Sequence, residues 1–344
     1  MPISWIYHIA LIIRHKLYDW GILKSKSFDQ PVICVGNLAL GGTGKTPHLE
    51  YLIDLLSEQY RVCVVSRGYG RKTKGFQLGS GTCCADTIGD EPMQYVTKFN
   101  DILVAVDENR NEAISLMNTM DRPPEIYLLD DAFQHRSTKA GLNLLLTSYD
   151  KLYAEDFLIP AGTLRDIRSA SRRADILIVS KSPSGLSQEQ KDTVIAKLKP
   201  LPHQKVFFST LQYETLEEAN RSAYQIDPEN ADAVLLFCGI ARPEPLKEEL
   251  ERRYRTVDFL AFPDHHPYSQ TDLETILQHY QNMEGDHKII VTTEKDYARL
   301  RNSPYICKFE STPLFVQPIS VRFFEENVFN KMILSHVQQD NRYS

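Results

Sequence analysis

A strong charge of one sign, paired cysteines and long apolar runs are all missing from this chain of 344 residues. Its 39 Lys and Arg face 45 Asp and Glu, which gives a formal net charge of −6 at pH 7. This balance excludes the strongly basic surface of a typical nucleic-acid-binding protein, so we expect no nucleic-acid partner. The hydrophobic fraction of 42% is ordinary for a folded chain. The length favours two lobes over a single domain.

The cysteine spacing excludes the common zinc patterns. Cys83 and Cys84 are adjacent, and no two of the six cysteines are separated by two residues. Cys34, Cys63 and Cys238 lie inside apolar runs, which is typical of small buried side chains in a reducing compartment. We therefore expect a protein of the cytosolic side.

The apolar stretch at 3–13 is too short to span a bilayer, which takes about 20 residues. It also lacks the basic start and the cleavage site of a signal peptide. Apolar and aromatic residues continue to position 22, mixed with basic residues at 14, 16, 24 and 26. This mixture suits a helix that lies in the headgroup layer of a membrane. On the residues alone, a helix packed on the core of the protein fits equally well.

Nine short apolar runs, rich in Val, Ile and Leu, predict strands that are buried on both faces. They lie at 32–35, 62–66, 102–106, 126–129, 142–147, 176–180, 206–210, 234–238 and 289–292. Helical patterns stand between many of them, for example at 47–59 and 188–198. Alternating strands and helices predict an α/β fold with a mostly parallel sheet flanked by helices.

A polar segment at 212–230 has no clear strand pattern and is a candidate boundary. We expect an amphipathic helix over 1–27, a core domain over 28–215 and a smaller C-terminal α/β lobe over 216–344.

A glycine-rich loop lies between the first predicted strand and the first predicted helix, as a P-loop requires. Its glycines let backbone N–H groups turn toward phosphate oxygens, and the helix N-terminus adds its positive dipole end. Lys45 would reach the β- and γ-phosphates of ATP, and the Thr46 hydroxyl would bind Mg²⁺. The residues expected to hold the nucleotide are Ala39, Leu40, Gly41, Gly42, Thr43, Gly44, Lys45 and Thr46. Ala39 departs from the usual motif, which has glycine at its position.

Two acidic residues, Asp130 and Asp131, end the predicted strand at 126–129. An acid at the carboxyl end of a strand is the usual partner of a P-loop and holds Mg²⁺ directly or through water. The sequence assigns both residues to the metal without dividing their roles. The predicted fold is therefore P-loop NTPase-like.

Two classes of nucleotide-binding protein fit these motifs. One is a kinase, and the other is a switch ATPase of the partition type that works by binding partners. Such ATPases carry an additional lysine where this chain has Leu40. The Asn-Lys-x-Asp loop with which GTPases read guanine is missing from the sequence. The kinase is favoured.

A basic, glycine-rich loop directly follows the second predicted strand, at the sheet edge where α/β proteins bind ligands. Arg67, Tyr69 and Arg71 in this loop suit a phosphorylated sugar, because arginine binds phosphate oxygens well. Arg165 adds another cation after a Pro-Ala-Gly run. A solvated turn is the alternative interpretation of the loop.

Phosphoryl transfer to a hydroxyl group also needs a base. The candidates are Asp90, two residues before a proline, and His265, in a Phe-Pro-Asp-His-His run. A carboxylate paired with a histidine can take the proton of a sugar hydroxyl. The residues alone allow plainer roles, a helix cap for Asp90 and an exposed loop position for His265.

These motifs, in this order, resemble the tetraacyldisaccharide 4′-kinase family of lipid A biosynthesis over most of the chain. The Ser-Arg-Gly-Tyr-Gly loop and the run at 130–135 are specific when found together, although Ala132 stands where the family usually has glycine. The motifs that carry the resemblance lie at 35–47, 65–70, 89–92, 130–135, 160–162, 262–265 and 292–296.

The resemblance implies transfer of the γ-phosphate of ATP, with Mg²⁺, to the 4′-hydroxyl of a tetraacylated glucosamine disaccharide 1-phosphate. It implies that Asp90 is the base, in concert with His265, and closure of the smaller lobe would bring the two together. By the same resemblance, Arg67 and His135 face nucleotide or substrate phosphates, and Asp130 and Asp131 lie near Mg²⁺.

The resemblance also implies a monotopic protein on the cytoplasmic face of the bacterial inner membrane, held there by its N-terminal helix. We expect no obligate protein partner. The alternative left open is a P-loop kinase or ligase for a soluble small-molecule acceptor, with the N-terminal helix packed internally.

Overall fold

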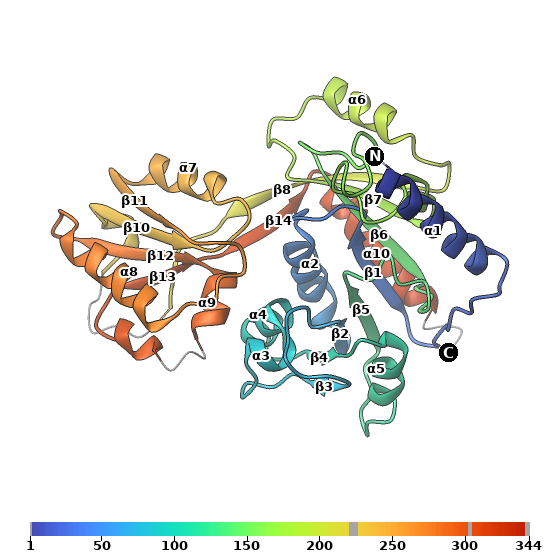
Figure 1. Cartoon of the computed structure of the whole chain (residues 1–344), viewed down its shortest axis with the longest axis horizontal. Coiled ribbons are helices and arrows are strands. Elements are labelled where there is room, and N and C mark those ends of the chain that lie inside the picture. Colours follow the sequence, from blue (N-terminus) through green and yellow to red (C-terminus); the bar gives the residue numbers. More distant parts are fainter. Residues whose placement is uncertain (1, 220–225, 302–304, 341–344) are drawn as a thin grey trace.

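The computed structural model describes residues 2–219, 226–301 and 305–340, and these residues form two sheets flanked by helices (Figure 1). The strands of the larger sheet are β1 (Val32–Asn37), β2 (Val62–Ser66), β3 (Gln77–Leu78), β4 (Leu103–Val106), β5 (Ile126–Asp130), β6 (Leu142–Ser148), β7 (Ile176–Ser180), β8 (Lys205–Tyr213) and β14 (Ile319–Phe323). Their order is β14-β8-β7-β6-β1-β5-β2-β4-β3. Strands β4, β2, β5, β1, β6, β7 and β8 run parallel, and the edge strands β3 and β14 are antiparallel to their neighbours.

Alternation along the strands divides the core of this larger lobe into two layers. In β1, Val32 and Cys34 pack in one apolar cluster, whereas Ile33 and Val35 pack in another, because successive strand side chains point to opposite faces. Both faces are covered by helices, so nearly every residue of these strands is apolar. The helices are α1 (Pro2–Asp19), α2 (Lys45–Ser57), α3 (Ala85–Ile88), α4 (Asp90–Lys98), α5 (Arg110–Met117), α6 (Gln188–Leu198) and α10 (Glu326–Asp340), with the short 3₁₀ helix η1 (Arg168–Arg173).

The smaller lobe is a second α/β unit with its own core. Its strands lie in the order β11-β10-β12-β13-β9, parallel except for β9 at the edge. The strands are β9 (Glu217–Glu218), β10 (Ala233–Cys238), β11 (Thr256–Ala261), β12 (Lys288–Thr293) and β13 (Leu314–Gln317), and the helices are α7 (Glu244–Arg253), α8 (Gln270–Asn282), α9 (Glu294–Leu300), η2 (Pro228–Asn230) and η3 (Ile306–Phe309).

The predicted α/β fold is confirmed, but the chain crosses between the lobes twice. Strand β8 leads out of the larger sheet, and β14 returns beside it as an antiparallel partner (Figure 1). Phe323 of β14 and Phe329 of α10 then stack in the core of the larger lobe, with ring centroids 3.9 Å apart. Strand β14 and helix α10 lie within the range 216–344 that was expected to form the C-terminal lobe, but they belong to the larger lobe. A run of apolar residues does not indicate which of two sheets it joins.

Helix α1 docks on the larger lobe through polar contacts. The Tyr7 hydroxyl donates to the Arg165 carbonyl at 2.8 Å, and the His15 ring lies 2.6 Å from the Asp166 carboxylate. Leu11 of this helix is buried, whereas Trp5 and Ile9 are exposed. Within the described ranges, no helix is long and apolar enough to cross a membrane.

Candidate active site

The glycine-rich loop connects β1 to α2 in a shape that only a glycine-rich sequence adopts easily. Gly41 has φ 103° and Gly44 has φ 82°, left-handed conformations that cost a residue with a Cβ atom about 1 kcal/mol or more. Gly44 precedes the first turn of α2, where Lys45 and Thr46 begin the helix. The backbone N–H groups of such a turn are unpaired within the helix and can meet phosphate oxygens.

Hydrogen bonds to residues outside the glycine-rich loop hold it in place. The Leu40 N–H donates to the Thr163 carbonyl at 2.7 Å, and the Ser180 hydroxyl donates to the Thr43 carbonyl at 2.7 Å. The Asn37 side chain donates to the Thr43 hydroxyl at 2.9 Å. Sequence reasoning missed Asn37, although it ends the strand that leads into the loop. Its signal in the sequence is a polar residue that directly follows five apolar positions, and the structure buries it fully.

The two acids that end β5 have different surroundings. Asp131, with φ 47°, makes an ion pair with Lys45 at 3.7 Å and receives two bonds from the Arg165 guanidinium. Burial acts to raise the pKa of Asp131, but the Lys45 and Arg165 cations outweigh burial and lower it. Asp130 is 1% exposed, and within the described residues the Ser66 hydroxyl donates to its side chain at 3.3 Å. Burial, together with the Glu91 and Asp131 carboxylates, raises its pKa to about 8.

These surroundings fit a divalent cation. The Oδ1 atom of Asp130 is buried and has no hydrogen-bond partner within the described part of the chain. A buried carboxylate without a partner is costly unless a cation compensates it. Magnesium prefers one or two carboxylates, waters and phosphate oxygens over a complete protein cage. Accordingly, no cluster of three or more His, Cys, Asp or Glu suited to a metal occurs among the described residues. Asp130 and the Thr46 hydroxyl are suited to hold Mg²⁺, whereas Asp131, the other expected ligand, is already paired with Lys45 and Arg165.

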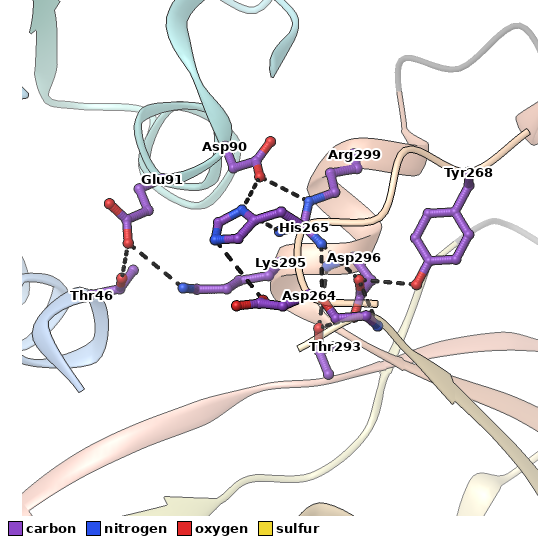
Figure 2. A network of polar contacts seen from close by, with 11 residues as sticks. Thr46, Asp90, Glu91, Asp264, His265, Tyr268, Thr293, Lys295, Asp296 and Arg299 are labelled. Atoms are coloured by element: carbon purple, nitrogen blue, oxygen red, sulfur yellow. Dashed lines mark hydrogen bonds and ion pairs between the residues drawn. The ribbon is translucent and has the colours of Figure 1, made fainter. Parts of the chain in front are cut away.

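The two candidate bases are in contact, although 175 residues separate them in the chain. Asp90 begins α4, and His265 lies in the smaller lobe after β11 with φ 60°. The His265 Nδ1 atom is 2.9 Å from Asp90 Oδ2 (Figure 2). Next to Asp90, Glu91 accepts from the Thr46 hydroxyl at 3.4 Å, which connects the pair to the glycine-rich loop.

The basic loop after β2 has an exposed part and a part that is paired within the protein. Arg67 and Tyr69 are exposed, and the Tyr69 ring centroid is 6.4 Å from that of His265. In contrast, Arg71 turns inward, where it makes an ion pair with Glu108 at 2.7 Å. Like Arg165, Arg71 is therefore already paired with an acid in this structure.

A half-buried group of cations lies beside the acidic pair. Burial, and then the Arg110, Arg67 and Arg14 cations, lower the pKa of His135 to about 4. Arg110, at the start of α5, is 4% exposed, and its Nε atom has no partner in the described residues. Sequence reasoning missed Arg110, because an arginine that opens a helix reads as a solvated residue. The arrangement brings together a phosphate-binding loop, a buried acid, an acid–histidine pair and cations suited to an anionic ligand.

Comparisons with known proteins agree with this chemistry. The family described as Tetraacyldisaccharide-1-P 4′-kinase matches residues 1–338. A protein of Bacteroides fragilis named tetraacyldisaccharide 4′-kinase is 43% identical over 99% of this chain and 93% of its own length. One of that name from Flavobacterium johnsoniae is 44% identical over 98% of this chain and 96% of its own. The crystal structure of the "apo" form of LpxK from Aquifex aeolicus in complex with ATP has a TM-score of 0.75 and 29% identity, covering 98% of each chain.

Proposed function

The chain belongs to the tetraacyldisaccharide-1-P 4′-kinase family, and on this premise we propose how its residues share the work. It is an ATP-dependent kinase of lipid A biosynthesis that phosphorylates the 4′-hydroxyl of a lipid-linked disaccharide, with ATP and Mg²⁺ as cofactors. The full-length similarity disfavours the alternative of a soluble acceptor. The observation that carries the assignment of roles is the contact between Asp90 and His265 next to the glycine-rich loop.

The nucleotide end of the site neutralises charge. Lys45 and the N–H groups of 39–46 would bind the β- and γ-phosphates, because phosphoryl transfer depends on positioning and charge compensation more than on covalent chemistry. Bound Mg²⁺ would supply further neutralisation of the phosphate oxygens. Asp131 is paired with Lys45 and Arg165, so its role is to orient these cations. Asp130 keeps the unpaired carboxylate oxygen.

The acceptor end moves one proton. The oxygen of the 4′-hydroxyl attacks the γ-phosphorus, the bond from that phosphorus to the β-phosphate oxygen breaks, and ADP leaves. Asp90 takes the hydroxyl proton as general base. His265, bonded to the same carboxylate, fixes its orientation. Arg67, Tyr69 and His135, with Arg110, would face phosphates of the nucleotide or the acceptor.

A transfer assay with ATP labelled at the γ-phosphate tests this assignment. The acceptor is tetraacyldisaccharide 1-phosphate in detergent micelles with Mg²⁺, and the variants are Lys45→Ala and Asp90→Ala. We expect the wild type to label the lipid and each variant to lose at least ~100-fold in rate. The exposed Lys331→Ala, in α10, is the matched control and should keep full activity. A folded, ATP-binding wild type that labels only soluble sugars would overturn the acceptor.

Helix α1 supports a further proposal, attachment to the cytoplasmic face of the inner membrane. Its polar contacts face the protein, whereas Trp5, Ile9 and Ile13 are 69%, 54% and 53% exposed. A surface helix of a globular protein usually has the opposite arrangement, with its apolar face packed on the core. An outward apolar face near basic residues suits a helix lying at the headgroup boundary, where the acyl chains of the acceptor are also found.

Flotation with vesicles that contain anionic phospholipid tests the attachment. Each of Trp5, Ile9 and Ile13 would bury about half of its surface, worth about 1 kcal/mol per residue. Replacing all three by Ser should therefore weaken binding on the order of 100-fold. Val328→Ser, at an apolar residue of α10 that is 61% exposed, should bind like the wild type. Unchanged flotation of the triple variant would refute the proposal.

A further inference from the structure

Helix α9 of the smaller lobe meets α4 of the larger lobe through a row of ion pairs. Lys98 at the end of α4 pairs with Glu294 at 2.7 Å and with Glu50 at 2.8 Å. Near the start of α4, Lys295 pairs with Glu91 at 3.6 Å. One helical turn beyond Lys295, Arg299 reaches the Asp90 carboxylate (Figure 2). The two adjacent acids that open α4 thus each face a cation of α9.

Arg299 contacts both members of the proposed base pair. Its Nε atom donates to Asp90 Oδ2 at 2.9 Å, and its Nη2 atom lies 3.1 Å from His265 Nδ1. Only 7% of its side chain is exposed. Both His265 Nδ1 and Arg299 Nε thus contact the same oxygen of Asp90, and neither occupies the other oxygen.

The opposite side of the guanidinium is anchored within the smaller lobe. Its Nη1 atom donates to Asp296 Oδ1 at 2.9 Å and to the Gly239 carbonyl at 3.2 Å. The same carbonyl accepts the His265 backbone N–H at 3.2 Å. Asp296 is fully buried and also accepts from the Tyr268 hydroxyl and the Gly239 N–H. Arg299 and the His265 loop are therefore held as one unit, and they approach Asp90 together.

The donors and acceptors of Arg299, His265 and Asp90 limit which hydrogen bonds they can form at the same time. A guanidinium only donates, and an ionised carboxylate only accepts. His265 Nδ1 can donate to Asp90, or it can accept from Arg299 Nη2, but it cannot do both at once. When Asp90 takes the proton of the acceptor hydroxyl on its other oxygen, Oδ2 can still accept from Arg299 Nε and from His265 Nδ1. Arg299 remains a donor to Asp90 in each arrangement, so it holds the carboxylate while the proton changes position.

We propose that Arg299 is a positioning residue, which couples docking of the smaller lobe to alignment of the Asp90–His265 base pair. This inference rests on the proposed function of these two residues. Without Arg299, the α9 helix would still dock through Lys295 and Glu294, but Asp90 would keep only one of its two cross-lobe partners. The effect should appear in the chemical step and leave nucleotide binding unchanged, because the hydrogen bonds of Arg299 within the described residues go to Asp90, His265, Asp296 and Gly239.

The first test compares Arg299→Met with the wild type in the lipid-labelling assay. We expect kcat to fall on the order of 100-fold, the cost of a misplaced catalytic group, while KM for ATP stays the same. Added guanidinium ion should restore part of the rate. Arg252→Met is the matched control, since in the described part of the chain Arg252 pairs with Glu248 and Glu249 of its own helix. A fall in ATP affinity at unchanged kcat would overturn the proposal.

A double-mutant cycle separates alignment from general stabilisation. In the His265→Ala background, Arg299→Met should cost much less than in the wild type, because both act through one carboxylate. Equal costs in the two backgrounds would mean that Arg299 merely supports the lobe, and the proposal would fail.

The second measurement does not depend on the acceptor. The ¹⁵N resonance of the His265 Nδ1 atom should move in Arg299→Met and stay in place in Arg252→Met. An unchanged resonance in Arg299→Met would refute the positioning role even if lipid labelling succeeds. A wild type that fails to label lipid, with the resonance moved as expected, would overturn the proposed function and leave the placement of His265 by Arg299 supported.

Discussion

Replacing Asp130 by Asn should stabilise the nucleotide-free protein and abolish its turnover. The carboxyl group is buried, one of its oxygens has no partner in the described residues, and two other carboxylates lie nearby. Its pKa of about 8 in the folded protein compares with 3.8 for an ordinary aspartate. Asparagine has the same shape without the charge. This exchange removes the cost of the isolated carboxylate and removes the expected Mg²⁺ ligand as well.

The sign and size of the stability change in Asp130→Asn follow from the difference in proton binding between the folded and the unfolded protein. Between pH 3.8 and pH 8 the folded protein holds a proton on Asp130 that the unfolded chain has released. Stability is therefore fully present below pH 3.8 and is lost as the pH rises, by at most about 1.36 kcal/mol per pH unit. By pH 7 this amounts to about 4 kcal/mol. Interaction with the neighbouring carboxylates and an imperfect fit of the amide reduce the gain for Asp130→Asn to about 2–4 kcal/mol.

Thermal unfolding followed by circular dichroism measures the effect. At about 2.1 cal/mol/K per residue, a chain of 344 residues gains about 3–6 °C in Tm at pH 7 from such a change. The gain should shrink toward pH 5. Mg²⁺ with ATP should raise the Tm of the wild type more than that of the variant, because only the wild type keeps the carboxylate for the cation.

A second buried aspartate provides the control. Asp156 accepts from the Thr163 hydroxyl and from backbone N–H groups, and although burial acts to raise its pKa, these bonds lower it. Asp156→Asn should therefore destabilise the protein. If Asp130→Asn also lowers Tm, or if its effect is the same at pH 5 and pH 8, the reasoning about an uncompensated carboxylate is refuted.

Two further predictions concern His48, in the first turns of α2, and Gly68, in the basic loop after β2. Burial lowers the pKa of His48 to about 4 from 6.5, so its contribution to stability is complete above pH 6.5 and is lost as the pH falls toward 4. His48→Gln should remove up to about 3 kcal/mol of this acid sensitivity, measured as the wild-type minus variant difference in urea unfolding from pH 7 to pH 4.5. Gly68→Ala should cost about 3 kcal/mol or more, because φ is 68° and the added Cβ atom would lie 2.4 Å from Val106 and 2.6 Å from the Ile88 carbonyl. Gly70→Ala, with φ 79° and open space around it, should cost only about 1–2 kcal/mol, and equal losses in urea unfolding would contradict this account.

Local pattern was enough to predict seven of the nine strands of the larger sheet and two strands of the smaller sheet. Each of the nine apolar runs is a strand, since buried parallel strands are continuous in Val, Ile and Leu. The same pattern missed the two-residue strands β3 and β9, which are too short to show any period. It also missed β11, whose half-buried residues lie between exposed ends at the edge of the smaller sheet, and it missed β13 and β14.

The sequence by itself determined the chemistry that each segment can perform. Spacing along the chain was enough to recognise the Gly, Lys and Thr after β1 and the acids at the end of β5. A strand end or a helix start positions the residues that are adjacent to it in sequence. Asp90 and His265 were recognisable as candidates by residue type.

Only the tertiary structure decided which of these residues meet. The contact of Arg299 with Asp90 joins positions 209 residues apart, and no periodicity connects them. The inward turn of Arg71, the buried surroundings of Asp130 and the outward apolar face of α1 likewise depend on what packs against each segment. Local steric preferences and the hydrophobic period determine where helices and strands form. The burial of a side chain, the compensation of its charge and its alignment with a partner are decided only when elements distant in sequence pack together.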